Sequence, residues 1–585
     1  MTATSEEEHV NQRGGEDSEE ELKGWRFNII SFLPVVTVRS LSRQFRRWTA
    51  NAPFLNVVIT LDVADLEADL DPLRREEERQ RLRVSTFLET WRGHVSLKFN
   101  DRWILHRRYE AGREVLPRGW HWVYSVATSF TRAASLDLDL SGLASPFHWL
   151  SMPACHAPAS QWECMRRLFY SLVPLQPAPV VGTRCSRRLQ GLPPDYVLPA
   201  NIVGLRIHDL YPNVDKNCVT RQPLLNLFLS STAGSLRKLD LTNCHIRGSK
   251  LATLATSLGE ALEELVLNKN YELSDNLCWV DPLAAALRRM CRLRVLSVSH
   301  CSLKYDDVIT LAAALVHCPS FTTLDVSHNR DWDRAFMNWD GTARALPDDY
   351  GLGPNLRQMS MLEDLNISNT NLGRAGTASL FTNLSAMNSI QLAKFKVLNV
   401  SGLDFEREAC TALQDLLLKM RGLRKLHIND LEEDAAEGME GLLVAIAGMV
   451  NLEVLSLSRH DAHYPDRVWR ALEQSLMDKT KLKQLNLHDI GMGLTGARAL
   501  SRCLPTLSSL TDLNLQCNSL DDKCIEVLAP ALESLVDREN GTYNSVVFYQ
   551  NRFTRSGFQT LSERVRQVCI MSINELDPLL TLPRV

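Results

Sequence analysis

A phrase of leucines closed by an asparagine returns along more than half of the chain, and it restricts the fold more than any other feature. The phrase reads Leu-x-x-Leu-x-Leu-x-x-Asn, with close variants. Three clear copies begin at Leu262, Phe321 and Leu510 and close at Asn270, Asn329 and Asn518. A unit of a few tens of residues cannot bury its apolar side alone, so successive units must stack. The phrase predicts a solenoid, whose repeated surface suits the binding of partners.

The repeats resemble those of leucine-rich repeat proteins. Strand cores are expected to open at Ile202, Leu236, Leu262, Leu293, Phe321, Leu362, Phe395, Leu423, Leu452, Leu482, Leu510 and Tyr543. Between strands, apolar residues share helix faces, as in the triplets Leu251/Leu254/Leu258, Val308/Leu311/Leu315 and Ala497/Leu500/Leu504. A full helix in each repeat resembles the ribonuclease-inhibitor class. The predicted fold is therefore an α/β leucine-rich repeat solenoid with a curved parallel sheet, convex helices and a small N-terminal helical module.

Composition shifts divide the chain into five expected parts. Residues 1–21 form an acidic, disordered tail, and residues 22–63 an apolar helical module. Residues 64–200 form a mixed region with a helix at 72–91, strands at 95–99 and 135–140 that include a degenerate early repeat, and a proline-rich insertion. The solenoid covers residues 201–570 and closes with a helix carrying Phe558, Leu561, Val565 and Val568, and residues 571–585 are a tail.

The solenoid should present two outward rows on its strands, because side chains alternate between the two faces of a sheet. Row A lies between the second and third leucines and comprises Arg206, Asp240, Val266, Ser297, Asp325, Asn366, Asn399, His427, Ser456, Asn486, Asn514 and Val547. Row B lies two residues further on and comprises His208, Thr242, Asn268, Ser299, Ser327, Ser368, Ser401, Asn429, Ser458, His488, Gln516 and Tyr549.

The side chains of these rows are polar, small and nearly uncharged. Residues 206–209 and 425–430 carry more charge and are therefore favoured as partner contacts. The predicted contact residues are Arg206, His208, Asp240, Asp325, Asn366, Lys425, His427, Asn486 and His488. The alternative is structural, since short Ser and Asn side chains suit a crowded, curved parallel sheet.

Composition indicates protein partners and no cofactor. The formal net charge of −4 argues against a dedicated nucleic-acid or anionic-membrane binder. The absence of a secretory signal and of a long apolar run predicts a cytoplasmic location, with the nucleus as the alternative. None of the 14 cysteines forms a Cys-x-x-Cys pair. Cys244 and Cys301 are expected as small core residues, and Cys155, His156, Cys164 and Cys185 fit no standard zinc motif.

Catalytic motifs are missing from the sequence. It contains neither a glycine-rich phosphate loop nor a Gly-x-Ser-x-Gly phrase, so we expect no enzyme. A loop near residue 460 gathers His460, Asp461, His463, Tyr464 and Asp466, but their spacing matches no helix-based metal pair and predicts a polar surface loop.

One repeat is longer than its neighbours. Between Phe321 and Leu362 it carries Asp331, Trp332 and Asp333 together with further acidic residues. Solenoid insertions leave as loops, so the insertion at residues 330–361 is interpreted either as an acidic-aromatic contact loop or as structural filler.

The N-terminal module has a short motif of its own. Leu22, Trp25, Ile29, Ile30 and Leu33 can line a first helix that Pro34 ends. Short helices with Leu41 and Trp48 follow. The order of the phrases Ser-Phe-Leu-Pro at 31–34 and Arg-Arg-Trp at 46–48, directly before leucine-rich repeats, resembles the F-box. Residues 21–24 lack the Leu-Pro opening usual in that family, and the alternative is a helical cap for the solenoid.

The F-box resemblance implies a substrate-recruiting subunit of an SCF-type ubiquitin ligase. Phe32, Leu33, Pro34, Leu41 and Trp48 would form the adaptor-binding framework, and the solenoid would select a protein substrate. The alternatives are a scaffold or regulatory solenoid without a ligase link, and RNA contact through the Arg- and Trp-rich residues 91–122, which nearby acids dilute.

Overall fold

The structure is a computed structural model of the 585-residue chain. It describes residues 27–30, 57–62, 94–100, 135–142, 202–208, 229, 232–244, 246–273, 279–330, 332, 351–431, 436–460, 464–535, 545–564 and 569–571. They belong to two compact units. Unit 1 comprises Met1–Cys244 and Ser257–Leu262, and unit 2 comprises His245–Thr256 and Glu263–Val585.

The described part of unit 1 is a parallel sheet in which each strand pairs with the next along the chain. Its strands are β1 (Phe27–Ile30), β2 (Val57–Asp62), β3 (His94–Asn100), β4 (Ser135–Gly142), β5 (Ile202–Arg206) and β6 (Lys238–Asp240). β3 and β4 confirm the strands expected at 95–99 and 135–140. In β4, Leu136 and Leu138 are buried, as the alternation predicts.

The structure corrects the helical expectation within residues 22–63. Ile29 and Ile30 lie in β1, not on a helix, and β2 occupies the end of the same segment. The run from Val57 to Thr60 is β-branched, which favours an extended backbone, and pairing with β3 satisfies its peptide groups. The adaptor-binding candidates Phe32, Leu33, Pro34, Leu41 and Trp48 lie outside the described residues, as do the acidic tail and the helix expected at 72–91.

Unit 2 alternates short strands with helices. Its strands are β7 (Glu264–Val266), β8 (Val295–Ser297), β9 (Thr323–Asp325), β10 (Asp364–Asn366), β11 (Val397–Asn399), β12 (Lys425–His427), β13 (Val454–Ser456), β14 (Gln484–Asn486), β15 (Asp512–Asn514), β16 (Ser545–Val547) and β17 (Cys569–Met571). Its helices are α8 (Gly248–Ser257, whose last residue belongs to unit 1), α9 (Val280–Leu287), α10 (Tyr305–Leu315), α11 (Leu352–Gln358), α12 (Gly373–Ser385), α13 (Ser389–Lys394), α14 (Arg407–Lys419), α15 (Ala436–Ala447), α16 (Asp466–Leu476), α17 (Gly493–Cys503), α18 (Asp522–Leu532) and α19 (Arg555–Arg564), with 3-10 turns η7 (Leu504–Thr506) and η8 (Glu533–Leu535).

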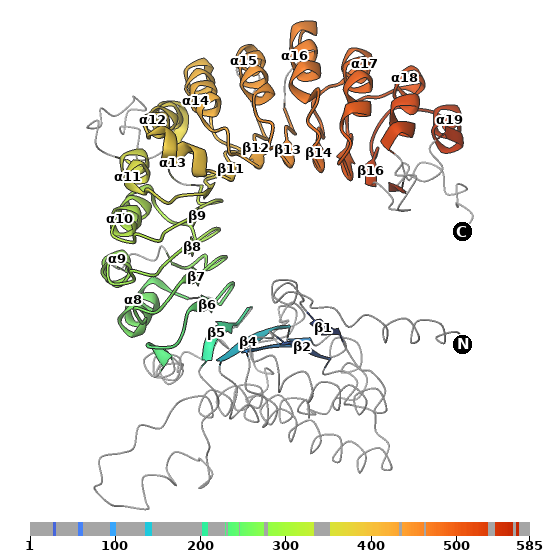
Figure 1. Cartoon of the computed structure of the whole chain (residues 1–585). Coiled ribbons are helices and arrows are strands. Elements are labelled where there is room, and N and C mark those ends of the chain that lie inside the picture. The colour runs from blue at the N-terminus through green and yellow to red at the C-terminus, as the bar shows by residue number, and fades with distance from the viewer. Residues whose placement is uncertain are drawn as a thin grey trace, which may run out of the picture. The chain divides into compact units, whose positions relative to one another are not determined.

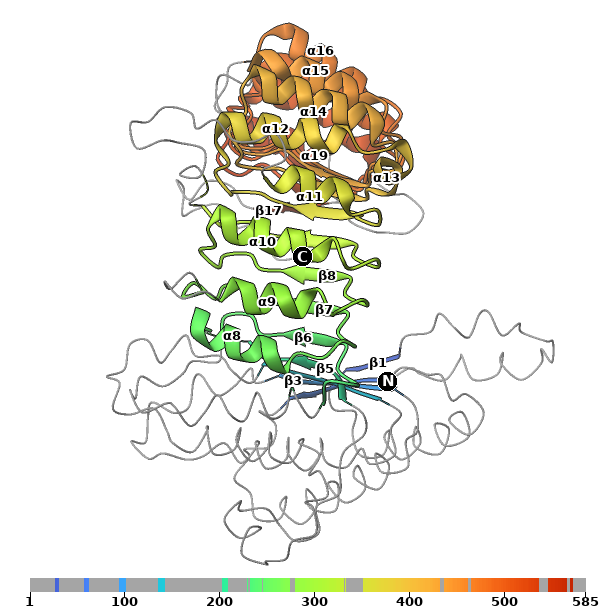
Figure 2. The ribbon, with the colours of Figure 1, turned by 90° about the vertical axis from the view of Figure 1, so that its left-hand side faces the viewer.

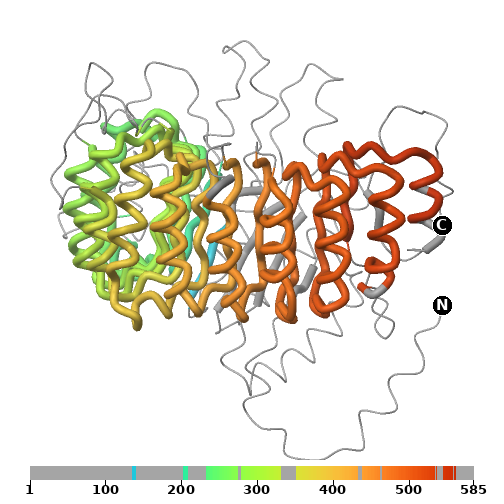
Figure 3. Tube along the Cα trace, turned by 90° about the horizontal axis from the view of Figure 1, so that it is seen from above, coloured from blue at the N-terminus to red at the C-terminus, as the bar shows by residue number. Residues whose placement is uncertain are grey.

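These elements form a leucine-rich repeat solenoid. Every strand from β7 to β17 pairs in parallel with the next one. Within unit 2 the strands line the inside of an arc and the helices cover its outside (Figure 1). The helices stack side by side (Figure 2) and run across the arc from one edge to the other (Figure 3). The predicted α/β fold, with its curved parallel sheet and convex helices, is confirmed.

The core of unit 2 follows the leucine phrase. In the repeat that contains β8, Leu293, Leu296 and Val298 are completely buried, and helix residues such as Leu311 and Leu315 pack on the other side. Each buried aliphatic side chain contributes roughly 1.5–3 kcal/mol relative to exposure. A strand of only three residues is therefore held mainly by the leucines on either side of its backbone.

A left-handed residue stands three residues after the end of each strand from β7 to β16. It stands directly before the phrase's last position, and we call it the turn residue. The turn residues of unit 2 are Lys269, His300, His328, Asn369, Gly402, Asp430, Arg459, Asp489, Cys517 and Gln550, with φ between 53° and 64°. The amides of the turn residues from Lys269 to Cys517 continue the ladder; that of His300, for example, donates to the carbonyl of Ser327 at 3.0 Å. The repeat therefore reverses direction without leaving these amides unpaired.

The last residues of the solenoid differ from the expected helical end. The last described helix, α19, ends at Arg564, and Val565 and Val568 lie outside the described residues. A further strand, β17, then pairs in parallel with β16 and reaches Met571. The sheet extends past the expected boundary because the apolar Cys569–Met571 run can pair with the exposed edge of β16.

Trp332 lies in the insertion at residues 330–361, which the sequence predicts to be either a contact loop or structural filler. Its side chain is completely buried, its Nε1 donates to the carbonyl of Leu303 at 3.0 Å, and its ring lies 5.3 Å from that of Tyr305. Trp332 is therefore a core residue and not part of a contact loop. Residues 331 and 333–350 lie outside the described part of the chain.

Candidate functional site

The row A residues of unit 2 lie side by side on the strand face. Asn366 of β10 stands in register with Asp325 of β9 on one side and Asn399 of β11 on the other. The same register continues through His427 and Ser456. The expected contact residues of unit 2 that belong to row A, Asp325, Asn366, His427 and Asn486, therefore form one line across the sheet.

Hydrogen bonds between neighbouring repeats join this line into a ladder. The hydroxyl of Ser327 donates to Asp325 at 2.7 Å, and Nδ2 of Asn366 donates to the hydroxyl oxygen of Ser327 at 3.3 Å. One repeat further, the hydroxyl of Ser368 donates to Asn366 at 2.9 Å, and Nδ2 of Asn399 donates to Ser368 at 3.4 Å. Asn366 therefore binds the row B serine of its own repeat and that of the preceding one, and Asn399 binds that of the preceding one.

The row B serines of this ladder do not face solvent as the alternation suggested. Ser299, Ser327, Ser368, Ser401 and Ser458 are each at most 7% exposed. Curvature brings adjacent repeats close together here, and the paired hydroxyls fill the space between them. The side chains of Asp325, Asn366 and Asn486 each hydrogen-bond a serine of the preceding repeat, which agrees with the structural interpretation of the polar face.

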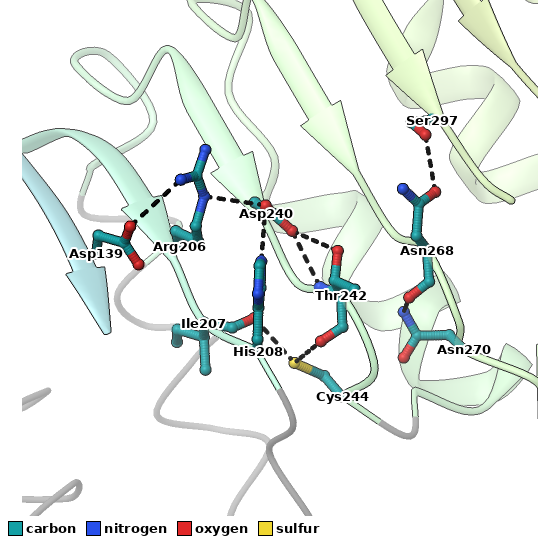
Figure 4. Close-up of polar contacts among 10 residues, drawn as sticks. All are labelled: Asp139, Arg206, Ile207, His208, Asp240, Thr242, Cys244, Asn268, Asn270 and Ser297. Atoms are coloured by element: carbon teal, nitrogen blue, oxygen red, sulfur yellow. Dashed lines mark hydrogen bonds and ion pairs between the residues drawn. The ribbon is translucent and has the colours of Figure 1, made fainter. Parts of the chain in front are cut away.

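At β12 the ladder moves from row A to row B. There the row B residue Asn429 takes the bridging role, donating from Nδ2 to Ser401 at 3.0 Å and accepting from the hydroxyl of Ser456 at 2.7 Å. The same change from row A to row B occurs at β7, whose row A residue is Val266. Ser297 donates to the row B residue Asn268 at 2.8 Å (Figure 4).

His427 is consequently left out of the ladder. Among the described residues, none forms a hydrogen bond with its imidazole. Burial, and then the neighbouring Lys425, lowers the pKa of His427 below its ordinary value. The ring is therefore neutral at physiological pH, with one nitrogen able to donate and the other able to accept a hydrogen bond.

Lys425 lies beside His427 on the same strand face. It is exposed, and its register neighbours are Val397 and Val454, both half-buried. In the described part of the chain its ammonium has no hydrogen bond or ion pair. The structure thus brings together a free cation, an unpaired imidazole and two partly exposed valines, which we call the β12 spot.

His488, the last expected contact residue of unit 2, follows β14 and is half-buried. Its backbone amide donates to Oδ1 of Asn486 at 3.1 Å, which fixes the turn after the strand. No described residue hydrogen-bonds its imidazole.

The three expected residues of unit 1 form a self-contained ionic cluster (Figure 4). Arg206 lies 3.3 Å from Asp139 and 3.1 Å from Asp240, and His208 lies 2.9 Å from the same oxygen of Asp240. Burial on its own would raise the pKa of Asp240, but the hydrogen bonds from His208 and Thr242 outweigh it and the pKa is lowered. The carboxylate of Asp240 is therefore ionised and already occupied by partners within its own unit.

His460 is buried, contrary to the expected surface loop. Its Nε2 lies 2.9 Å from the carbonyl of Ile428 and its Nδ1 lies 2.8 Å from the hydroxyl of Tyr464. Burial lowers the pKa of His460 to about 4. Asp461 and His463 lie outside the described residues. Within the described ranges no three His, Cys, Asp or Glu side chains gather in a way that could hold a metal ion.

Sequence reasoning missed a pair of turn residues. The imidazoles of His300 and His328 stack with centroids 4.0 Å apart and planes inclined by 19°. Burial lowers the pKa of both rings. The signal was available in the sequence, since histidine stands directly before the last position of two successive phrases.

The buried cysteines agree with expectation. Cys244 and Cys301 are buried, and the thiol of Cys301 donates to the carbonyl of Leu267 at 3.1 Å. Burial raises the pKa of Cys301 to about 12, so the thiol stays protonated. In the described part of the chain, no helix has the length and apolar character needed to cross a membrane.

Comparisons with known proteins give similarity at the level of structure. An internalin from Listeria monocytogenes is 14% identical, with a TM-score of 0.32 over 64% of this chain and 74% of its own. A leucine-rich repeat protein from Leptospira interrogans is 14% identical, with a TM-score of 0.34 over 77% and 92%. A chain from the complex of Rad7 and Elc1 in yeast is 17% identical, with a TM-score of 0.36 over 60% and 72%. No protein-family model and no curated protein matches the chain.

Proposed function

We propose that this chain is a non-enzymatic, protein-binding solenoid that contacts its partner at the β12 spot. The observation that carries the proposal is the break in the polar ladder. Neighbouring row A side chains are bound to adjacent repeats, whereas His427 and Lys425 have no such partner among the described residues.

The ladder makes the strand face a rigid platform. The ladder orders the side chains around the β12 spot before a partner arrives, so among the polar side chains of this face binding has to order mainly Lys425 and His427. The parallel strands on either side fix the backbone of β12 in the same way.

The chemistry of the β12 spot fits a protein segment with a carboxylate next to an apolar side chain. Lys425 supplies the positive charge, His427 one donor and one acceptor, and Val397 and Val454 an apolar surface. Arg424 is adjacent, and Glu453, 3.6 Å away, partly neutralises it. A polypeptide presents this mixture of groups, whereas a nucleic acid would require more unpaired cations.

The test compares proteins retained by the full-length chain and by a Lys425→Glu/His427→Asp variant. We expect the variant to lose specific partners, while a Glu526→Lys control on the outer face of α18 keeps them. Equal retention by all three chains would contradict a binding role for the β12 spot.

The more specific proposal is substrate recruitment to an SCF-type ubiquitin ligase. Its support is the resemblance of residues 31–34 and 46–48 to the F-box. The strand at Ile29 and Ile30 counts against it, because it takes the place of part of the expected first helix. Leu33→Asp and Trp48→Asp are expected to abolish association with an SCF adaptor–cullin pair while the Lys425→Glu variant still associates. If the unmodified full-length chain does not bind the adaptor–cullin pair, the ligase proposal fails and the protein is a scaffold without a ligase link.

A further inference from the structure

The edge of unit 2 where helices end and strands begin has an unusual surface. Strands run parallel and each helix returns in the opposite direction, so the helix-to-strand turns of successive repeats share one edge (Figures 1 and 3). We call it the helix-to-strand edge. Between α9 and β15 its turns comprise residues 288–294, 316–322, 359–363, 386–396, 420–424, 448–453, 477–483 and 504–511.

This edge is strongly basic. The turns between α9 and β15 contain eleven lysines and arginines but only three carboxylates, Glu363, Glu453 and Asp478. The basic residues are Arg288, Arg289, Arg292, Arg294, Lys394, Lys396, Arg421, Arg424, Lys479, Lys481 and Lys483. This excess stands out in a chain whose net charge is −4.

Structural roles account for only part of the basic charge. Lys394 and Lys479 donate to carbonyls at the ends of preceding helices, and Lys396 pairs with Glu363 at 2.5 Å. Cations also favour helix C-termini in general. Five arginines, however, have no side-chain hydrogen bond or ion pair with any described residue. They are Arg288, Arg292, Arg294 and Arg421, and Arg357 in the last turn of α11.

Exposed apolar side chains gather on the same edge. Seven large hydrophobic residues are exposed in the described part of the chain, and Ile390 (72%) and Val450 (67%) are the most exposed. Met361 and Met477 lie in the same set of turns, while Leu418 and Val444 lie in the last turns of α14 and α15. Tyr271, the seventh, follows β7 at the opposite edge. Exposed apolar residues concentrated in this way mark an interaction surface.

We propose that the helix-to-strand edge binds an acidic protein segment that carries aliphatic side chains along one side. Charge complementarity selects acidic residues, and the aliphatic side chains between the cations select an apolar face. This site lies along the edge of the repeats, next to the β12 spot on the strand face, and Arg424 and Glu453 stand between the two. It extends the function proposed above.

The repeat spacing fits a helical segment. Strands lie roughly 4.8 Å apart and packed helices roughly 8–10 Å apart, so edge residues recur at an intermediate spacing. A helix rises about 5.4 Å per turn. Aliphatic residues on successive turns of a partner helix can therefore meet successive repeats from Met361 to Met477.

The residue types favour a protein over the other polyanions. Trp and Tyr anchor proteins at bilayer interfaces, and aromatic rings stack nucleic-acid bases. The exposed apolar residues of the described helix-to-strand edge are all aliphatic or methionine. These side chains match the aliphatic face of an acidic peptide.

The experiment uses the full-length chain and a fluorescent peptide with leucine on one helix face and glutamate elsewhere. An Ile390→Glu/Arg421→Glu variant is expected to weaken peptide binding by about tenfold or more. A Tyr271→Glu/Arg330→Glu control makes the same charge change on the opposite edge and is expected to bind like the original chain. Circular dichroism melting confirms that both variants are folded.

Three results would overturn the proposal. They are no binding of the peptide by the original chain, equal weakening in the edge and control variants, and binding of phosphatidylserine vesicles or a single-stranded oligonucleotide in place of the peptide. None of them depends on whether the β12 spot binds a partner, so failure here is distinguishable from failure of the proposed function.

Discussion

Asparagine and histidine occupy the same place in different repeats because both can bridge backbone groups. At the last position of the phrase, Nδ2 of Asn329 donates to the carbonyl of Val298, and Nδ2 of Asn518 donates to that of Leu487. His460 stands at the equivalent position and uses Nε2 to reach the carbonyl of Ile428. The buried imidazole of His460 therefore takes the place of the side-chain amide of asparagine and binds a backbone carbonyl within the chain.

The buried His460 gives the solenoid a defined acid sensitivity. Its pKa is about 4 in the folded chain, below the ordinary value of 6.5, because burial disfavours the charged ring. Above pH 6.5 neither state binds a proton and stability is unaffected by this group. Between pH 6.5 and pH 4 the unfolded chain gains a proton that the folded chain rejects, so stability falls by about 3 kcal/mol in total.

A His460→Asn variant tests this origin. It keeps a side chain that can donate to Ile428 but does not titrate, so its urea midpoint should fall less between pH 7 and pH 4 than that of the original chain. A His488→Asn variant, changed at a half-buried imidazole, serves as the control. The same pH dependence in all three chains would rule out His460 as the source.

Helix ends within the solenoid are satisfied by lysines from the following repeat. The ammonium of Lys419 donates to the carbonyl of Ser385 at 2.9 Å, and that of Lys394 donates to Ser360 at 3.1 Å. Lys479 is the buried member of this set, at 3% exposed, and donates to Ile446 and Met449 at 2.9 and 3.0 Å. These bonds occupy carbonyls that a helix leaves unpaired at its C-terminus.

Lys479→Met is expected to destabilise unit 2 by about 1–3 kcal/mol, because it leaves buried carbonyls without donors. Lys419→Met is the matched control, since its ammonium is exposed and its loss should cost less than about 1 kcal/mol. Urea denaturation of the two variants measures the difference. Equal losses of unfolding free energy in the two variants would mean that the burial of the Lys479 hydrogen bonds adds nothing to stability.

Stability in unit 2 as a whole is a sum over repeats and their interfaces, because each repeat packs only on its neighbours. Leu398→Ala removes a completely buried side chain in β11 and is expected to cost about 2–5 kcal/mol. Hydrogen exchange should rise in β10, β11 and β12 and remain unchanged in β15. Leu418→Ala, at a half-exposed position, is the control. A uniform rise across unit 2 would indicate one cooperative block instead.

Periodicity was sufficient for the repeating part of the molecule. The leucine phrase placed every strand from β5 to β16, the helix faces and the buried cysteines, because a spacing of apolar residues translates directly into which side chains can face a common core. It failed at Ile29 and Ile30, where an apolar run fits a helix or a strand equally well and only pairing with β2 decides between them.

The candidate site depended on contacts between repeats that no local pattern encodes. Alternation placed Asp325, Asn366 and Asn486 on the strand face, but the ladder that occupies them exists only once neighbouring repeats are curved against each other. The same geometry isolates His427, because Asn429 bridges in its place. A residue's spacing in the chain predicts the face on which it lies, whereas its freedom to bind a partner is decided by the neighbours that folding brings to it.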